Sequence, residues 1–69
     1  MGDSVYKVIE LVGTSSESWE KAAANAVNRA AESLRDLRIA EIVQFDMHLE
    51  DGKVKAYRAK VKISFKYEG

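Results

Sequence analysis

Few residues of this chain are of the types that carry out chemistry, and none stands in a catalytic pattern. His48 is the only histidine, and no cysteine is present to act as a nucleophile. No serine sits in a nucleophile-elbow pattern, and the acidic residues lack the spacing of an EF-hand calcium loop. In an oligomer, carboxylates from several copies of the chain could meet at a symmetry axis, and the sequence of one chain leaves such a site open. We therefore expect a binding or assembly protein and not an enzyme.

Regularly spaced polar side chains are more informative. Residues 56–67, AYRAKVKISFKY, alternate apolar and basic side chains, and residues 43–50 alternate apolar and polar ones. A period of two is typical of a β-strand with unlike faces. The polar rows are Gln44, Asp46, His48 and Glu50 on one strand and Arg58, Lys60, Lys62 and Lys66 on the other. We interpret them as a polar wall facing water or a ligand, with the lysines solvated or paired across strands.

Length and charge narrow the class of protein. The chain has 69 residues with 11 basic and 11 acidic side chains, which is the size of one domain, expected to span residues 1–69. Zero net charge argues against a nucleic-acid-binding protein, because such domains are usually basic. No apolar run approaches the roughly 20 residues that span a membrane, and the N-terminus lacks a signal-peptide core. We expect a cytoplasmic protein without nucleic-acid or membrane partners.

The first part of the chain predicts a strand and then a helix. Residues 5–12, VYKVIELV, are rich in β-branched and aromatic side chains and predict a strand that Gly13 ends. Residues 14–16 supply candidate N-caps, with Thr14 and Glu17 at capping-box spacing. A glycine followed by hydroxyl residues can also hold phosphate at a helix start. This stretch lacks the lysine of a P-loop, so capping alone is favoured.

The helix is predicted from apolar residues that recur at three- and four-residue steps. They are Trp19, Ala22, Ala23, Ala26, Val27, Ala30, Ala31 and Leu34. An apolar stripe made mostly of alanine lets a helix lie close to a sheet. We expect Trp19 and Leu34 to fill the two ends of this contact, with Trp19 a core anchor and not a ligand platform.

A hairpin follows, with its turn at Asp51-Gly52. A two-residue loop would place Phe45 opposite Arg58 and mix the two faces, so we predict a three-residue loop that begins at Glu50. That loop pairs Phe45 with Tyr57, and it also sets Gln44 opposite Arg58. The order β-α-β-β then predicts an α+β fold: a three-stranded antiparallel sheet in the order 1-3-2 that partly wraps one helix.

We expect such a chain to form an oligomer and not to be a monomer. A helix of about 17 residues spans roughly 25 Å, whereas the last strand would reach about 45 Å if extended. We expect the overhang to expose Ile63, Phe65 and Tyr67, and Tyr57 at the far end. Apolar surface of this kind normally marks an interface. We therefore predict a protomer of a closed oligomer whose long hairpins wrap their neighbours.

The complete pattern resembles the dodecin family. The resemblance covers essentially the whole chain: VYKVIELVGTS, then an alanine-rich helix, AEIV, and a long hairpin that ends in SFKY. It implies a homododecamer, a hollow sphere that binds a flavin (FMN, riboflavin or FAD) and stores or buffers it. Family members that bind flavin carry a stacking tryptophan where this chain has Ile39. They also carry a ring-binding glutamine where this chain has Arg58.

These two replacements imply an altered pocket. Ile39 offers no flat aromatic surface, and Arg58 donates hydrogen bonds but accepts none. We name Ile39, Arg58 and Gln44 as candidate ligand-binding residues. Loss of tight flavin binding is slightly favoured, and retained flavin binding stays open as an alternative. SWEKAAANAV, RIAEIV and QFDM resemble the calcium-dodecin branch, which implies calcium as an alternative ligand and Asp46 as the metal ligand. A structural assembly domain without a ligand is the remaining alternative.

Overall fold

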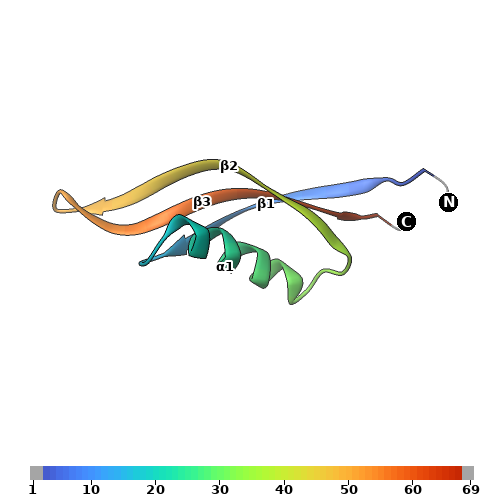
Figure 1. The fold of residues 1–69 in the computed structure, drawn as a ribbon, viewed down its shortest axis with the longest axis horizontal. Helices are drawn as coiled ribbons and strands as arrows, with labels where there is room; N and C mark the ends of the chain where they lie inside the picture. Colours follow the sequence, from blue (N-terminus) through green and yellow to red (C-terminus); the bar gives the residue numbers. More distant parts are fainter. Residues whose placement is uncertain (1–2, 68–69) are drawn as a thin grey trace.

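The computed structural model describes residues 3–67. Strand β1 (Tyr6–Ser15) is followed by helix α1 (Trp19–Ala31), strand β2 (Leu37–Glu50) and strand β3 (Lys53–Lys66). The strands form one antiparallel sheet in the order β1-β3-β2, and α1 lies along one face of it (Figure 1). The predicted α+β fold is thus confirmed.

The strand β1 is longer than predicted, because Gly13 does not end it. Gly13 pairs with Ala59 in the ladder and is buried against α1. A Cβ at this position would collide with the carbonyl oxygen of Ala22 and lie 3.0 Å from the Cβ of Ala26. Glycine is therefore required here by the close approach of helix and strand and not by a turn.

Because β1 continues to Ser15, the helix begins later than predicted, at Trp19. The N-cap is Ser18, whose side chain accepts a hydrogen bond of 3.0 Å from the backbone N–H of Lys21. The hydroxyl of Ser15 instead accepts from the N–H of Glu17 at 2.9 Å within the connecting loop. The predicted caps at residues 14–16 were therefore wrong. Because α1 has 13 residues, Leu34 lies beyond its end but still packs against the core.

The hairpin joins β2 to β3 by two residues and not by the predicted three. Asp51 and Gly52 both have positive φ, 55° and 74°, as a type I′ turn requires. A two-residue turn alone would place apolar side chains of β2 opposite basic side chains of β3. An irregularity prevents this: Leu49 pairs with Val54 and His48 with Ala56, so Lys55 has no partner in the ladder. The two faces are consequently those predicted, but the register differs by two residues. Phe45 lies opposite Ala59, and Asp46 opposite Arg58.

The core lies between the alanine stripe of α1 and the middle of β3. Its buried members are Ala22, Ala26, Ala30, Ala59, Val61 and Ile63. Ile63 was predicted to be exposed and is 1% exposed, because the long strands place it under the helix. Tyr67, also expected to be exposed, is 53% exposed. The largest group of exposed apolar side chains lies on β2: Ile39, Ile42, Val43, Phe45, Met47 and Leu49. The molecule is 53 Å long, and 13 helical residues cover only about 20 Å of it.

Candidate functional site

An ion pair is the centre of the polar face. Asp46 and Arg58 are directly opposed in the β2–β3 ladder, so their side chains lie on the same face, away from α1. The Arg58 Nε donates to Asp46 Oδ1 at 2.7 Å, and Nη2 donates to Oδ2 at 2.9 Å. Gln44 donates a third, longer bond of 3.4 Å to Oδ2. Three predicted site residues thus form one cluster.

This geometry keeps both groups charged. The hydrogen bond from Arg58 holds the pKa of the Asp46 carboxyl below its ordinary value of 3.8, with smaller contributions from Gln44 and the charge of Lys60. The same bond raises the pKa of the Arg58 guanidinium. A bidentate pair between arginine and a carboxylate fixes both side chains in one plane. The cluster is therefore a preorganised polar site with its carboxylate already occupied.

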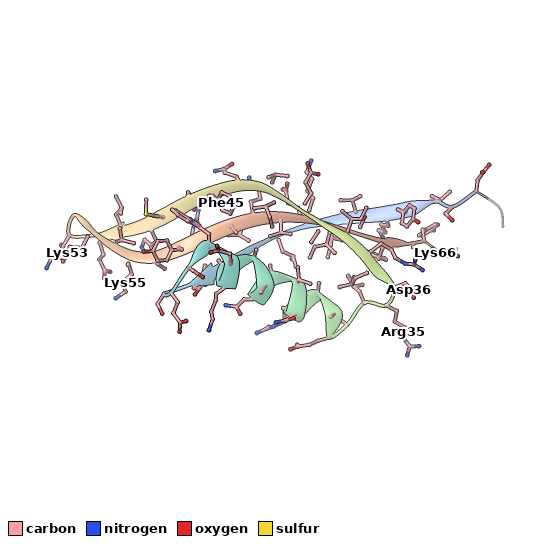
Figure 2. The ribbon with its side chains drawn as sticks, in the orientation of Figure 1. Arg35, Asp36, Phe45, Lys53, Lys55 and Lys66 are labelled. Carbon is pink, nitrogen blue, oxygen red and sulfur yellow. The ribbon has the colours of Figure 1, made fainter. Side chains whose placement is uncertain are left out.

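Trp19 supports the cluster from the other face of the sheet. Its indole N–H donates to the backbone carbonyl of Asp46 at 3.1 Å. Its ring centroid lies 5.7 Å from that of Phe45 and 5.1 Å from that of Tyr57, the latter in an edge-on arrangement. Figure 2 shows Phe45 on β2 near the first turn of α1. Trp19 is thus an anchor, as predicted, and it holds the strand segments that carry Asp46 and Arg58.

The site residue Ile39 lies apart from this cluster. The ladder pairs it with Ser64, six residues from Arg58 along β3, which is roughly 20 Å at the rise of an extended strand. It is 67% exposed and borders a small hollow of about 160 Å³. A single protomer therefore does not bring Ile39 and Arg58 into one pocket.

The remaining basic residues of the polar face differ in their neighbours. Lys62 lies between Glu10 on β1 and Glu41 on β2. Lys60 lies between Val12 and Gln44, neither of which is charged. The acidic side chains diagonal to Lys60 are Asp46, already bonded to Arg58, and the Glu10 and Glu41 that flank Lys62. Lys62 therefore has acidic side chains directly opposite on both sides, whereas Lys60 has none directly opposite.

An apolar hollow on the helix side is the feature that the sequence interpretation missed. Its volume is about 480 Å³, and its lining is Trp19, Glu20, Ala23, Ile42 and Phe45. The exposure of Phe45, 56%, gives this hollow an aromatic wall open to the outside. The spacing of the apolar residues on β2 contained the signal, because α1 packs mainly on β1 and β3 and leaves the β2 edge of the sheet uncovered.

The donor types of the cluster fit a hard cation, but one protomer offers too few of them. Calcium takes six to eight oxygen ligands. Among residues 3–67, no group of three histidine, cysteine or acidic side chains is placed to hold a metal ion. Asp46 and Gln44 offer a carboxylate and an amide oxygen. Further ligands must come from backbone, water or other copies.

Comparison with known proteins gives a consistent result. The Dodecin family model matches residues 5–68. A calcium dodecin from Mycobacterium tuberculosis is 49% identical over 63 residues, which cover 91% of this chain and 89% of that protein. A dodecin from Thermus thermophilus is 38% identical over 64 residues, 93% of each chain.

Solved structures agree with the observed fold. A dodecin from Streptomyces coelicolor superposes with a TM-score of 0.92 at 38% identity, covering 100% of this chain and 99% of that one. The crystal structure of the calcium dodecin from M. tuberculosis, described as having a novel calcium-binding site, superposes with a TM-score of 0.84 at 48% identity, covering 94% and 93%. Among the described residues, no helix is long and apolar enough to cross a membrane.

Proposed function

Because the chain belongs to the dodecin family, we propose that it is a non-enzymatic subunit of a closed homododecamer that buffers a small ligand. We further propose that this ligand is calcium and not a tightly held flavin. One observation carries the choice against flavin: Arg58 directs Nε and Nη2 at Asp46. These donors are therefore engaged at the position where the resemblance implies a glutamine for the flavin ring. Ile39 offers no aromatic surface for stacking.

Two features support calcium. The carboxylate of Asp46 and the amide oxygen of Gln44 are hard oxygen donors on the same exposed face. The similarity to a protein called calcium dodecin, at 49% identity, is also higher than the 38% to the Thermus protein called dodecin. Asp46 is the metal ligand in this proposal, and Gln44 lies beside it. A cytoplasmic location, expected from the sequence, is part of the same proposal.

The assembly follows from surface that one protomer leaves open. The aromatic hollow beside Trp19 and the exposed apolar residues of β2 extend past the short helix. Exposed apolar surface of this size on a small chain favours an interface. Because Ile39 and Arg58 are far apart in one chain, a pocket that uses both must form between two protomers. Symmetry-related copies would also supply the calcium ligands that one chain lacks.

Native mass spectrometry of the purified protein tests these proposals together. We expect the mass of a homododecamer that takes up calcium and does not retain FMN added at equimolar concentration. A homododecamer that binds FMN would overturn the choice of ligand. A homododecamer that binds neither would make the chain a structural assembly domain. A monomer would overturn the assembly.

A further inference from the structure

The tip of the β2–β3 hairpin combines backbone strain with exposure. Asp51 and Gly52 form its two-residue turn, and both are exposed. Asp51 has a φ of 55°, a left-handed conformation that is unfavourable for a residue with a Cβ. At Gly52, no atom beyond its two chain neighbours lies within 4 Å of the position that a Cβ would take. The turn is therefore strained at Asp51 and unobstructed at Gly52.

Few contacts hold this turn closed. The ladder beside it is irregular, because Lys55 has no partner. Within residues 3–67, the N–H of Gly52 donates to no other backbone group, and the carboxylate of Asp51 joins no ion pair. The turn also lies beyond the part of the sheet that α1 covers (Figure 1). Segments with so few buried contacts open locally more often than a core does.

An open Asp-Gly turn allows a reaction within the chain itself. The backbone nitrogen of Gly52 can attack Cγ of the Asp51 side chain, which closes a five-membered succinimide ring. The N–Cγ bond forms, the bond from Cγ to the hydroxyl breaks, and the hydroxyl leaves with the proton of the nitrogen as water. Water then adds to either ring carbonyl. Ring opening at Cγ restores aspartate, whereas ring opening at the main-chain carbonyl carbon gives isoaspartate, and neither needs an oxidant, a reductant or a cofactor.

We propose that Asp51 is a site of spontaneous isoaspartate formation. Gly52 favours the reaction because it has no side chain to hinder the approach of its nitrogen. In the product the main chain runs through Cβ and Cγ of residue 51 and is one atom longer. The loop is then no longer a two-residue type I′ turn, so the left-handed strain at Asp51 is released. The modification changes the hairpin tip and leaves the core beneath α1 as it is.

Asp36 shows why the hairpin tip is selected. Asp36 is also exposed and also has a positive φ, 58°. Its carbonyl oxygen, however, accepts a hydrogen bond of 3.3 Å from the N–H of Lys66. The next residue is Leu37, which pairs with Phe65 and packs against the core. Attack by the nitrogen of Leu37 would break this packing, so left-handed strain without a glycine and a free tip does not make a site.

Peptide mapping of the intact, assembled protein tests the proposal after long incubation at neutral pH and body temperature. A protease that cuts before aspartate does not cut before isoaspartate, so a modified chain stays joined between Glu50 and Asp51. The same digest reports on Asp36 and Asp46 in the same molecules. We expect a joined fragment to accumulate with time at Asp51 and not at Asp36. Its mass should equal that of the unmodified sequence, because the water lost in the first step is regained in the second.

Three variants identify the reacting groups, with methyl transfer by an isoaspartate-specific methyltransferase as the common measurement. Asp51→Glu keeps the charge but would have to close a six-membered ring, so the isoaspartate signal should be lost. Gly52→Ala keeps Asp51 and places a methyl group beside the attacking nitrogen, so the signal should fall. Asp36→Glu is the matched control, because it makes the same change at the other left-handed aspartate, and the signal should equal that of the unmodified protein.

Each contrary result has its own meaning. If the unmodified protein never exceeds Asp51→Glu in isoaspartate signal, the proposal is wrong. If Asp36 is modified as fast as Asp51, the hairpin tip is not selected and the structural argument is wrong. Protein unfolded in urea supplies the reference for the sequence alone. Because folding holds Leu37 in the core, the preference for Asp51 over Asp36 should be larger in the folded protein, and an equal preference in urea would contradict the role of the fold.

Discussion

The indole N–H of Trp19 donates a 3.1 Å hydrogen bond to the backbone carbonyl of Asp46, so the helix is tied to the strand position that carries the ion pair. Asp46 turns its carboxylate to the polar face and its carbonyl to Trp19. Trp19 is the only tryptophan of the chain. Its fluorescence should therefore report changes at Asp46, which lies on the opposite side of the sheet.

Replacing Trp19 tests this tie. Trp19→Phe keeps an aromatic ring near Phe45 and Tyr57 but removes the donor to the Asp46 carbonyl. We expect a loss of about 1–2 kcal/mol in the free energy of unfolding, from the hydrogen bond and the smaller ring. Urea unfolding at fixed protein concentration measures it. His48→Ala, at an exposed position two residues from Asp46, should change stability little; an equal loss in both variants would contradict the assigned role.

The two internal glycines offer a matched pair of substitutions. Gly13→Ala puts a methyl group into the backbone of α1 at Ala22, and we expect a cost of at least about 2 kcal/mol. Gly52→Ala meets open space but keeps a φ of 74°, for which we expect about 1 kcal/mol. Thermal unfolding of both variants measures the difference. The opposite ranking would mean that α1 does not approach β1 this closely.

The lowered pKa of Asp46 predicts that the protein loses stability as the solution becomes acidic. Because the hydrogen bond from Arg58 lowers the pKa of Asp46 in the folded protein, the pair contributes its full stability above the ordinary value of 3.8. That contribution is lost as the pH falls through the lowered pKa. Carboxyl NMR titration should therefore show no change at Asp46 between about pH 5 and pH 8. In Arg58→Gln the pKa should rise, and an unchanged pKa would contradict the bidentate pair.

Restoring the two residues implied by the family resemblance should restore flavin binding. The double variant Ile39→Trp with Arg58→Gln gains a stacking surface, worth about 0.5–1.5 kcal/mol per aromatic pair. It also gains an amide that both donates and accepts. We expect FMN affinity at least about tenfold above that of the unmodified protein, measured by quenching of flavin fluorescence. Each single variant should give less, and no gain in the double variant would mean that these positions do not line the pocket.

The sequence by itself determined the element order, the faces of the strands and the composition of the core stripe. Alternation along residues 43–50 and 56–67 assigns each side chain to a face, because successive residues of a strand point in opposite directions. The alanine spacing of α1 likewise predicts a thin helix face. The grouping of Gln44 and Asp46 with Arg58 on one face followed from parity alone.

Only the tertiary structure decided the register, the helix start and the identity of the ion pair. The two-residue turn at Asp51-Gly52 would by itself place apolar side chains opposite basic ones, and the unpaired Lys55 shifts the pairing by one residue so that like faces meet. No local pattern in the sequence predicts that irregularity. In the sequence Gly13 is typical of a strand end, whereas in the structure it is the point at which α1 packs closely on β1. Asp46 rather than Gln44 meets Arg58 because a two-residue shift of pairing preserves the faces and changes every partner. The face of the sheet on which a side chain lies depends on the local period of the sequence, whereas the residue it pairs with depends on contacts between distant segments.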